Sequence, residues 1–284
     1  MSDAETASRL LEMSGLRDTD RDRYLACLLT PVSARGSIAA LYAFNAEIAR
    51  IRDLVREPLP GEMRLQYWRD LLEGSAHGST EANPVAAALL ETMAKHRLPV
   101  DALAGMIEAR IFDLYDDPME TTAMFEGYAG ETASALIQLS SLVLDAGAAA
   151  GAASMAGHAG VAQAIAGALL LMPAHRARGQ LYLPLEILSA VGLDRESFLA
   201  GEDRARISAA IEAFAGLGLD HLRKARAAGA LPRSLVPAYL TVALSEPVLT
   251  AAKRKGAAIF DGSLRPPQWR RQLRLLRASV TGAF

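Results

Sequence analysis

Apolar residues recur every three or four positions along most of this chain, the spacing that places them on one face of a helix. Residues 44–53, "FNAEIARIRD", lie in the clearest such stripe, which is formed by Leu41, Phe44, Ile48, Ile51 and Val55. Thr30 before Pro31 predicts the start of this helical region, because threonine can cap free amides and proline fits the first turn. Similar stripes predict helices over residues 63–72, 85–96, 103–115, 124–144, 161–171, 207–228, 235–259 and 269–280.

Strand patterns are absent, since no segment shows sustained alternation of β-branched and polar residues. One short extended candidate is residues 179–183, "GQLYL", which ends at Pro184. Prolines and glycines, Pro173 among them, separate the stripes, and no shift in composition marks a second domain. We therefore expect an all-α fold of roughly ten helices, with an N-terminal arm over residues 1–20 and a single helical domain over residues 21–284.

The composition permits a large core and indicates no highly charged partner. A chain of 284 residues hides about three quarters of its unfolded surface. The 30 basic residues offset the 32 acidic ones, so we expect no nucleic acid partner. Cys27 lies in the apolar run "YLACLL" and is expected to be a small buried hydrophobe.

The N-terminus shows no signal or transit pattern, and glycines interrupt the charge-poor residues 146–175, so we expect a cytoplasmic protein without a transmembrane segment.

Polar residues accompany the stripe of residues 44–53. Taken alone, Glu47, Arg50 and Asp53 indicate a solvated helix face with an internal ion pair. Asn45, Ala49 and either Arg52 or Asp53 lie beside the stripe, where a helix could present them to a cavity.

Acidic residues cluster in "FDLYDDPMET", at Asp113, Asp116, Asp117 and Glu120. Helical spacing can bring such carboxylates together as ligands of a hard cation such as Mg²⁺. The alternative is a helix that ends before Pro118, with the following acids near the start of the next helix, where negative charge is favourable.

The segment "HRARGQLYLP", residues 175–184, combines Arg176 and Arg178 with a turn at Gly179. Two guanidiniums beside a turn can bind a phosphate, and a surface loop can carry the same residues. His96, His158 and His221 have no second ligand at metal spacing, and no HExxH, CxxC or glycine-rich phosphate loop occurs.

The C-terminal stretch "PPQWRRQLRLLRASV" predicts a basic amphipathic helix. Its apolar face consists of Trp269, Leu273, Leu276 and Val280, and its other faces carry Arg270, Arg271, Arg274 and Arg277. This pattern suits an anionic membrane surface or an acidic partner, and it also suits a last helix that packs on the core.

In chain order, several segments resemble the squalene/phytoene synthase family, the all-α enzymes that join two prenyl diphosphates head to head. They run from about Tyr24 to the C-terminus and include "YLACLLTPVSARGSIAALYAFNAEIARIRD", "RLQYWRDLLEG", "NPVAAAL", "YAGETASAL", "GVAQAIAGALLLMPAHRARGQLYLP" and "LRLLRA". The resemblance implies an isoprenoid-synthase-type helical bundle around a central cavity. In active members two aspartate clusters face each other across that cavity and hold the diphosphates through Mg²⁺.

This chain departs from both family motifs. The adjacent aspartates of the first motif are replaced by Ala49 and Arg50, and only Asp53 remains. The second motif spans Gln163 to Pro184, with Leu170 at its first acidic position and Arg178 and Tyr182 in the "RGQLYLP" turn. No Asp or Glu occurs between Ala146 and Leu185, so Mg²⁺ ions and diphosphates would lack ligands and counter-charges.

In these departures the chain resembles the mitochondrial complex I assembly factors, a catalytically degenerate branch of the same superfamily. That resemblance implies a non-catalytic assembly or accessory factor that acts with subunits or assembly intermediates of respiratory NADH:quinone oxidoreductase, without a cofactor. It is expected to be cytoplasmic, peripheral on the inner face of the cytoplasmic membrane, and able to hold a prenyl or other lipid in the cavity. The alternatives are an active Mg²⁺-dependent prenyltransferase that uses Asp113, Asp116 and Asp117, and a lipid-binding module unrelated to respiration.

Overall fold

The stripe around residues 44–53 is divided between two helices, α4 (Val32–Ala49) and the short α5 (Ile51–Leu54). Val55 follows in an extended conformation, with φ −126° and ψ 152°. Thr30 does not cap α4, which corrects the prediction: its hydroxyl donates to the Ala26 carbonyl at 3.0 Å, and Pro31 occupies the N-cap position. The bend after Ala49 redirects the chain just before Arg52 and Asp53.

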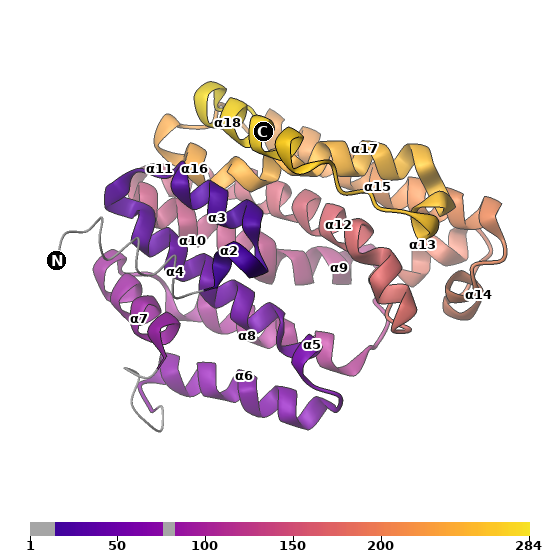
Figure 1. Ribbon diagram of the computed structural model, residues 1–284, viewed down its shortest axis with the longest axis horizontal. Helices are drawn as coiled ribbons and strands as arrows, with labels where there is room; N and C mark the ends of the chain where they lie inside the picture. The colour runs from indigo at the N-terminus through magenta and orange to yellow at the C-terminus, as the bar shows by residue number, and fades with distance from the viewer. Residues whose placement is uncertain (1–14, 76–82) are drawn as a thin grey trace.

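The computed structural model describes residues 15–75 and 83–284, and helices make up its whole architecture (Figure 1). No strand occurs in these two ranges, so the all-α prediction is confirmed, although the helices are shorter and more numerous than expected. The remaining α-helices are α2 (Leu16–Thr19), α3 (Arg21–Leu28), α6 (Pro58–Glu73), α7 (Pro84–His96), α8 (Val100–Tyr115), α9 (Thr122–Ala129), α10 (Ala135–Leu144), α11 (Ala146–Gly151), α12 (Ala153–Ala177), α13 (Leu185–Ala190), α14 (Arg195–Ala200), α15 (Arg204–Ala227), α16 (Val236–Tyr239), α17 (Ser245–Lys255) and α18 (Gln268–Thr281). A π-helical turn, Gly130–Ser134, joins α9 to α10, and 3-10 segments cover Arg233–Leu235, Leu240–Leu244 and Gly256–Asp261.

The long helix α12 runs through the middle of the bundle beside α15 (Figure 1). Pro173 was expected to end a helix, but α12 continues to Ala177, because a proline near the last turn removes one hydrogen bond without stopping the chain. A Cβ added at Gly160 would overlap the backbone of Ser134, so this glycine allows α12 to lie directly against the π-helical turn.

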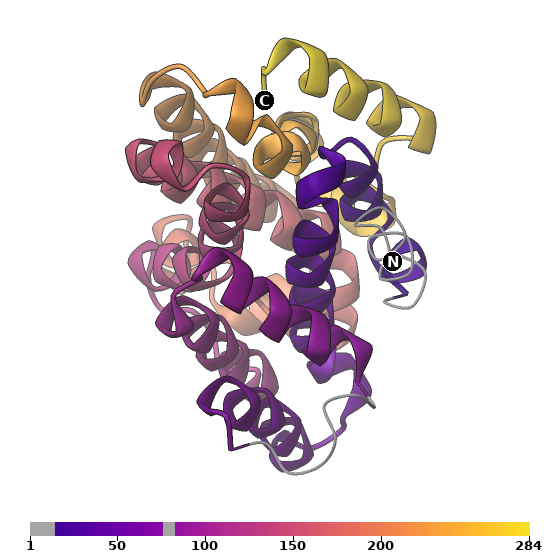
Figure 2. The ribbon, with the colours of Figure 1, turned by 90° about the vertical axis from the view of Figure 1, so that its left-hand side faces the viewer.

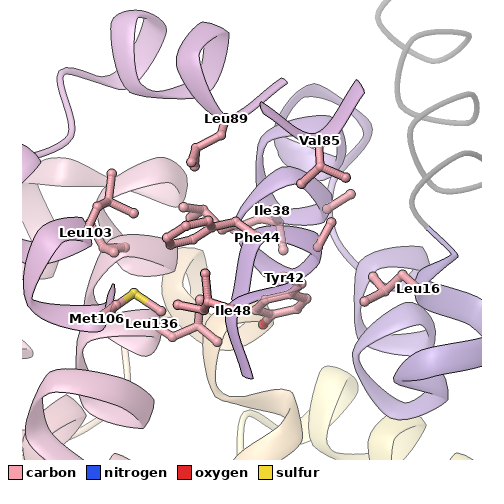
Figure 3. Close-up of a cluster of buried hydrophobic side chains, with 14 of the residues drawn as sticks. Leu16, Ile38, Tyr42, Phe44, Ile48, Val85, Leu89, Leu103, Met106 and Leu136 are labelled. Atoms are coloured by element: carbon pink, nitrogen blue, oxygen red, sulfur yellow. The ribbon is translucent and has the colours of Figure 1, made fainter. Parts of the chain in front are cut away.

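The N-terminal half of the core forms around α4 (Figure 3). Phe44 and Ile48 of α4 meet Leu103 and Met106 of α8, and the ring of Phe44 packs edge-on against Trp68 of α6 at 5.1 Å between centroids. Leu16 is fully buried in the same cluster, so the described end of the N-terminal arm is part of the packed domain; residues 1–14 of the arm lie outside the described residues. Cys27 is also buried there, and burial raises the pKa of its thiol, as expected for an inert side chain.

Helices α6 and α18 lie at opposite edges of the molecule, with the rest of the bundle between them (Figures 1 and 2). Two stretches are long and apolar enough to cross a membrane by length and composition, Ala153–Ala177 and Arg233–Asp261. The sequence interpretation expected none. Both stretches are part of the bundle. Of the 18 most apolar consecutive residues in each stretch, 56% and 72% are buried inside the protein.

Residues 179–183 do not form a strand, contrary to the extended candidate. Leu181 and Leu183 point into the core formed by α12 and α15, while Tyr182 between them reaches Asp113 with its hydroxyl at 2.7 Å. This alternation places one polar ring of the "RGQLYLP" turn on the inside of the bundle.

The core position of Phe44 leads to a stability prediction. Replacement Phe44→Ala should lower the free energy of unfolding by about 3–5 kcal/mol, because it removes a fully buried ring and leaves a cavity. Leu59→Ala on α6 is the control, since Leu59 is 67% exposed and should lose less than about 0.5 kcal/mol. Urea denaturation measures both, and equal losses for the two variants would contradict the packing described for α4.

Candidate functional site

A cavity of about 480 Å³ lies between α4 and α5 on one side and α12 on the other. Its walls include seven of the positions singled out from the sequence: Asn45, Ala49, Asp53, Gln163, Leu170, Arg178 and Tyr182. Arg50 was expected in the same pocket, but it is not among the lining residues. Its half-exposed guanidinium lies 3.5 Å from Glu47, the ion pair on the outer helix face that the isolated segment suggested.

Arg52, one residue after the bend, crosses to the end of α8. Its Nη2 donates to Oδ2 of Asp116 at 2.6 Å, and Gln180 Nε2 donates to Oδ1 at 2.5 Å. Burial raises the pKa of Asp116, but these hydrogen bonds outweigh it and the net pKa is lowered. The pair therefore stabilises the fold above the ordinary pKa of an aspartate, and that contribution is lost as the pH falls through the lowered folded-state pKa.

Asp113 is the most deeply buried carboxylate of the cavity, at 7% exposure. It accepts hydrogen bonds from Tyr182 at 2.7 Å, from Tyr128 at 3.0 Å and from Arg110 Nη1 at 3.1 Å. Burial, and then the charge of Asp113, raises the pKa of Tyr182, so its hydroxyl stays protonated and donates. The carboxylate is thereby fully engaged with protein donors.

His175 packs at a tilt against Tyr182, with ring centroids 4.7 Å apart and an interplanar angle of 44°. Burial lowers its pKa, which makes the imidazole neutral near pH 7. It therefore adds a hydrogen-bonding group to the cavity and no charge.

The cavity lining includes α3, a segment that the sequence interpretation had not assigned to it, beside the expected Asp53 and Arg178. Asp20 pairs with Arg23 at 2.5 Å, Asp22 pairs with Arg271 of α18, and Asp53 pairs with Arg178 at the end of α12. Sequence reasoning missed Asp22 and Arg110 because each lies in an ordinary charged stretch, and only the fold brings it to its partner.

These residues do not fit a cluster of Mg²⁺ ions. A Mg²⁺ site needs carboxylate oxygens free to bind metal, usually together with bound water. Asp53, Asp113 and Asp116 each pair with an arginine instead. Across the cavity, α12 presents Gly167, Leu170, Leu171 and Ala174. Within the described parts of the chain, no three His, Cys, Asp or Glu residues are arranged to hold a metal ion.

The acidic segment after α8 is a helix end, the second of the two interpretations left open. Helix α8 stops at Tyr115, and Asp116 occupies its C-cap in a left-handed conformation with φ 56°. Asp117 is exposed and lies outside the cavity lining. The three aspartates therefore point to different surroundings and do not converge on one point.

Helix α18 presents an apolar outer face next to the cavity rim. Trp269, Leu273, Leu276 and Val280 are 52–65% exposed, while Leu275 and Ala278 pack inward. Arg270 stacks over Trp269 at 5.1 Å, and Arg274 and Arg277 are exposed beside it. Arg271 was expected to belong to this surface, but its side chain is only 11% exposed and pairs with Asp22.

Two of the histidines meet although their sequence spacing gave no sign of it. His158 of α12 and His221 of α15 approach with their Nδ1 atoms 3.1 Å apart, and Glu126 of α9 binds Nε2 of His221 at 3.1 Å. Burial lowers the pKa of His158, and the neighbouring His221 lowers it further. This chain of polar groups connects three helices away from the cavity.

Sequence comparison finds a protein family and several curated relatives that match most of this chain. Residues 16–277 match the model of the family described as squalene/phytoene synthase. Curated relatives named "NADH dehydrogenase (ubiquinone) complex I, assembly factor 6" are 32% identical in Rattus norvegicus, over 90% of this chain and 77% of the relative, and 32% identical in Homo sapiens, over 88% and 75%. A 15-cis-phytoene synthase from a Synechocystis strain is 26% identical over 64% of this chain and 58% of the relative.

Solved structures share the fold at low sequence identity. A squalene synthase, HpnC, from Alicyclobacillus acidocaldarius superposes with a TM-score of 0.72 at 19% identity, over 89% of this chain and 94% of its own. A dehydrosqualene synthase solved with a ligand gives a TM-score of 0.74 at 16% identity, over 98% of each chain. The expected isoprenoid-synthase-type bundle is thus confirmed, and by its sequence match over residues 16–277 the chain belongs to the squalene/phytoene synthase family.

Proposed function

We propose that this protein is a non-catalytic member of its family that serves as an assembly or accessory factor for respiratory complex I and keeps the cavity as a site for a lipid. The observation that carries the proposal is the pairing of Asp53, Asp113 and Asp116 with Arg178, Arg110 and Arg52. Carboxylates that are neutralised by the protein itself are poor ligands for Mg²⁺.

The chemistry of the family depends on those ions. Ionisation of an allylic diphosphate places negative charge on the leaving group, and clustered divalent ions stabilise that charge. Arginines can bind a diphosphate as well, but here Arg52 and Arg178 are held by aspartates. The wall that α12 contributes has no acidic residue with which to rebuild the second cluster.

The assembly role is supported by the names of the curated relatives, which match along most of this chain. Its partners would be subunits or assembly intermediates of respiratory NADH:quinone oxidoreductase. A protein with this role needs a surface for its partner and a stable fold, and it needs no metal cofactor.

Helix α18 supports a place at the membrane. It has no acidic residue, and exposed Trp269 and Leu273 lie beside exposed Arg270, Arg274 and Arg277. An amphipathic helix of this kind inserts its apolar face at the headgroup level while its arginines attract anionic lipids. We therefore propose that the protein is cytoplasmic and peripheral on the inner face of the cytoplasmic membrane.

The catalytic test uses the purified protein with farnesyl or geranylgeranyl diphosphate and Mg²⁺. We expect no release of diphosphate and no C30 or C40 hydrocarbon above background, because the cavity lacks free metal ligands. A family enzyme assayed in parallel is the positive control. Turnover by this protein that is abolished in Asp116→Ala would refute the non-catalytic role and favour the active prenyltransferase.

The assembly role is tested by deleting the gene in its own host. We expect the amount and activity of assembled complex I to fall, and a plasmid copy of the gene to restore both. Blue-native gels and NADH:quinone activity of membranes measure the effect. Normal complex I in the deletion strain would refute the assembly role and leave a lipid-binding module unrelated to respiration.

Membrane binding is tested by co-sedimentation with vesicles containing anionic lipid. The triple variant Arg270→Gln, Arg274→Gln, Arg277→Gln should bind roughly 100-fold more weakly, at about 1 kcal/mol for each cation near the surface. A matched control, Lys253→Gln, Arg254→Gln, Lys255→Gln, removes the same charge from exposed positions on α17. Binding should weaken as salt is added. Equal losses in both variants would show that net charge, and not α18, directs the protein to membranes.

A further inference from the structure

The charges of the cavity satisfy one another. Its lining carries Asp20, Asp22, Asp53 and Asp113, and their partners are Arg23, Arg271, Arg178 and Arg110. A fifth pair, Arg52 with Asp116, closes the end of α8. Of the charged lining residues, Arg265 alone has no acidic partner within the described chain, and it is exposed at the rim.

Inside the cavity, away from Arg265 at its rim, the free recognition groups are uncharged. Asn45 is only 5% exposed, lines the cavity and makes no side-chain hydrogen bond to any described residue, so its carboxamide is open to a ligand. Gln163 is held by one hydrogen bond, from Nε2 to Thr241 at 3.1 Å, which leaves its carbonyl available. His175, neutral near pH 7, is a third such group. These three side chains line the cavity, where a ligand could supply hydrogen-bond partners.

The inner walls suit an apolar chain. Helix α12 contributes Ala164, Gly167 and Ala168, and the opposite walls contribute Phe125 and Val248. A Cβ added at Gly167 would meet nothing within 4 Å, so the helix leaves open space there. The volume of about 480 Å³ lies within the range of roughly 300–1,000 Å³ that is typical of small-molecule sites.

We infer that this cavity binds a lipid with an apolar chain and an uncharged head, such as a prenyl alcohol, in preference to a prenyl diphosphate and independently of Mg²⁺. The inference rests on the lipid-holding part of the proposed function. Apart from Arg265 at the exposed rim, the guanidiniums of the lining could meet a diphosphate only by leaving their aspartates. The cost is largest for Arg110, because its partner Asp113 is only 7% exposed. A hydroxyl or carbonyl head can bond to Asn45 without disturbing any ion pair.

The test compares farnesol with farnesyl diphosphate, since the two share one chain and differ in the charged head. Equilibrium dialysis of the full-length protein with each tritiated compound, with and without Mg²⁺, gives the dissociation constants. We expect farnesol to bind at least tenfold more tightly, with no effect of Mg²⁺. Tighter binding of the diphosphate, or binding of either compound that requires Mg²⁺, would overturn the inference.

Placement in the cavity is tested by Gly167→Leu, which fills the open space beside α12. We expect farnesol binding to fall more than tenfold, with the thermal unfolding midpoint retained. Gly157→Leu is the matched control, because it makes the same change in the same helix, also meets nothing within 4 Å at Cβ, and lies outside the lining. Binding that survives Gly167→Leu, or is lost equally in Gly157→Leu, would place the ligand elsewhere and overturn the inference.

The role of the ion pairs is tested by the double variant Asp53→Asn, Asp116→Asn, which frees Arg178 and Arg52. Asparagine tolerates the left-handed conformation of Asp116, so the local backbone is preserved. The ratio of diphosphate to farnesol affinity should rise at least tenfold, and an unchanged ratio would contradict the argument from charge. Tight diphosphate binding by the wild-type protein without turnover would overturn this inference alone, whereas turnover would overturn the proposed function.

Discussion

Arginine–carboxylate pairing around one cavity is the constraint on which the rest of this molecule depends. A carboxylate as buried as Asp113 is stable only with a cation and hydrogen-bond donors beside it, and losing one partner of such a pair typically costs about 3–5 kcal/mol. The pairs also connect distant segments. Arg52 ties α5 to the end of α8, Arg178 ties the end of α12 to α5, and Arg271 ties α18 to α3. The pairs that neutralise the cavity therefore also link the segments around it, while apolar burial holds the bundle together.

Helix α12 explains how the fold persists without the acidic residues of the second family motif. Its packing depends on small residues: Gly160 lies against the backbone of Ser134, and Gly218 of α15 lies against the side chain of Ile165. Its cavity side carries alanine, glycine and leucine together with Gln163 and His175. None of these contacts requires a metal ligand, because the bundle is held by apolar burial on the far side of the helix. The architecture therefore does not depend on the acidic motif.

The apolar outer face of α18 and its neighbouring arginines lie next to the cavity rim. Arg271, on the inward side of this helix, binds the lining residue Asp22, and Arg265 reaches the rim just before α18 begins. A membrane that engages Trp269 and its neighbours would therefore lie next to the opening of the cavity. This arrangement relates the proposed lipid ligand to the proposed location without any rearrangement of the bundle.

The sequence was sufficient for the all-α class, the family, the Trp269–Val280 face and most of the cavity positions, because helical periodicity and the order of short motifs are local properties that survive substitution. It did not predict that Arg50 lies outside the cavity, that Arg271 is buried against Asp22, or that α12 continues past Pro173. The side on which a helical residue lies depends on where the helix ends and on what packs against it: α4 ends at Ala49, Arg50 pairs with Glu47 on the outer face, and Arg52 reaches Asp116 at the end of α8. Partners such as Asp22 with Arg271, or His158 with His221, are far apart in the chain, and no local pattern encodes a contact that forms only when distant helices meet. The absence of the family's second acidic motif is thus a property of the sequence. The arginine–aspartate pairs around the cavity are a property of the tertiary structure, because they form only when distant helices pack together.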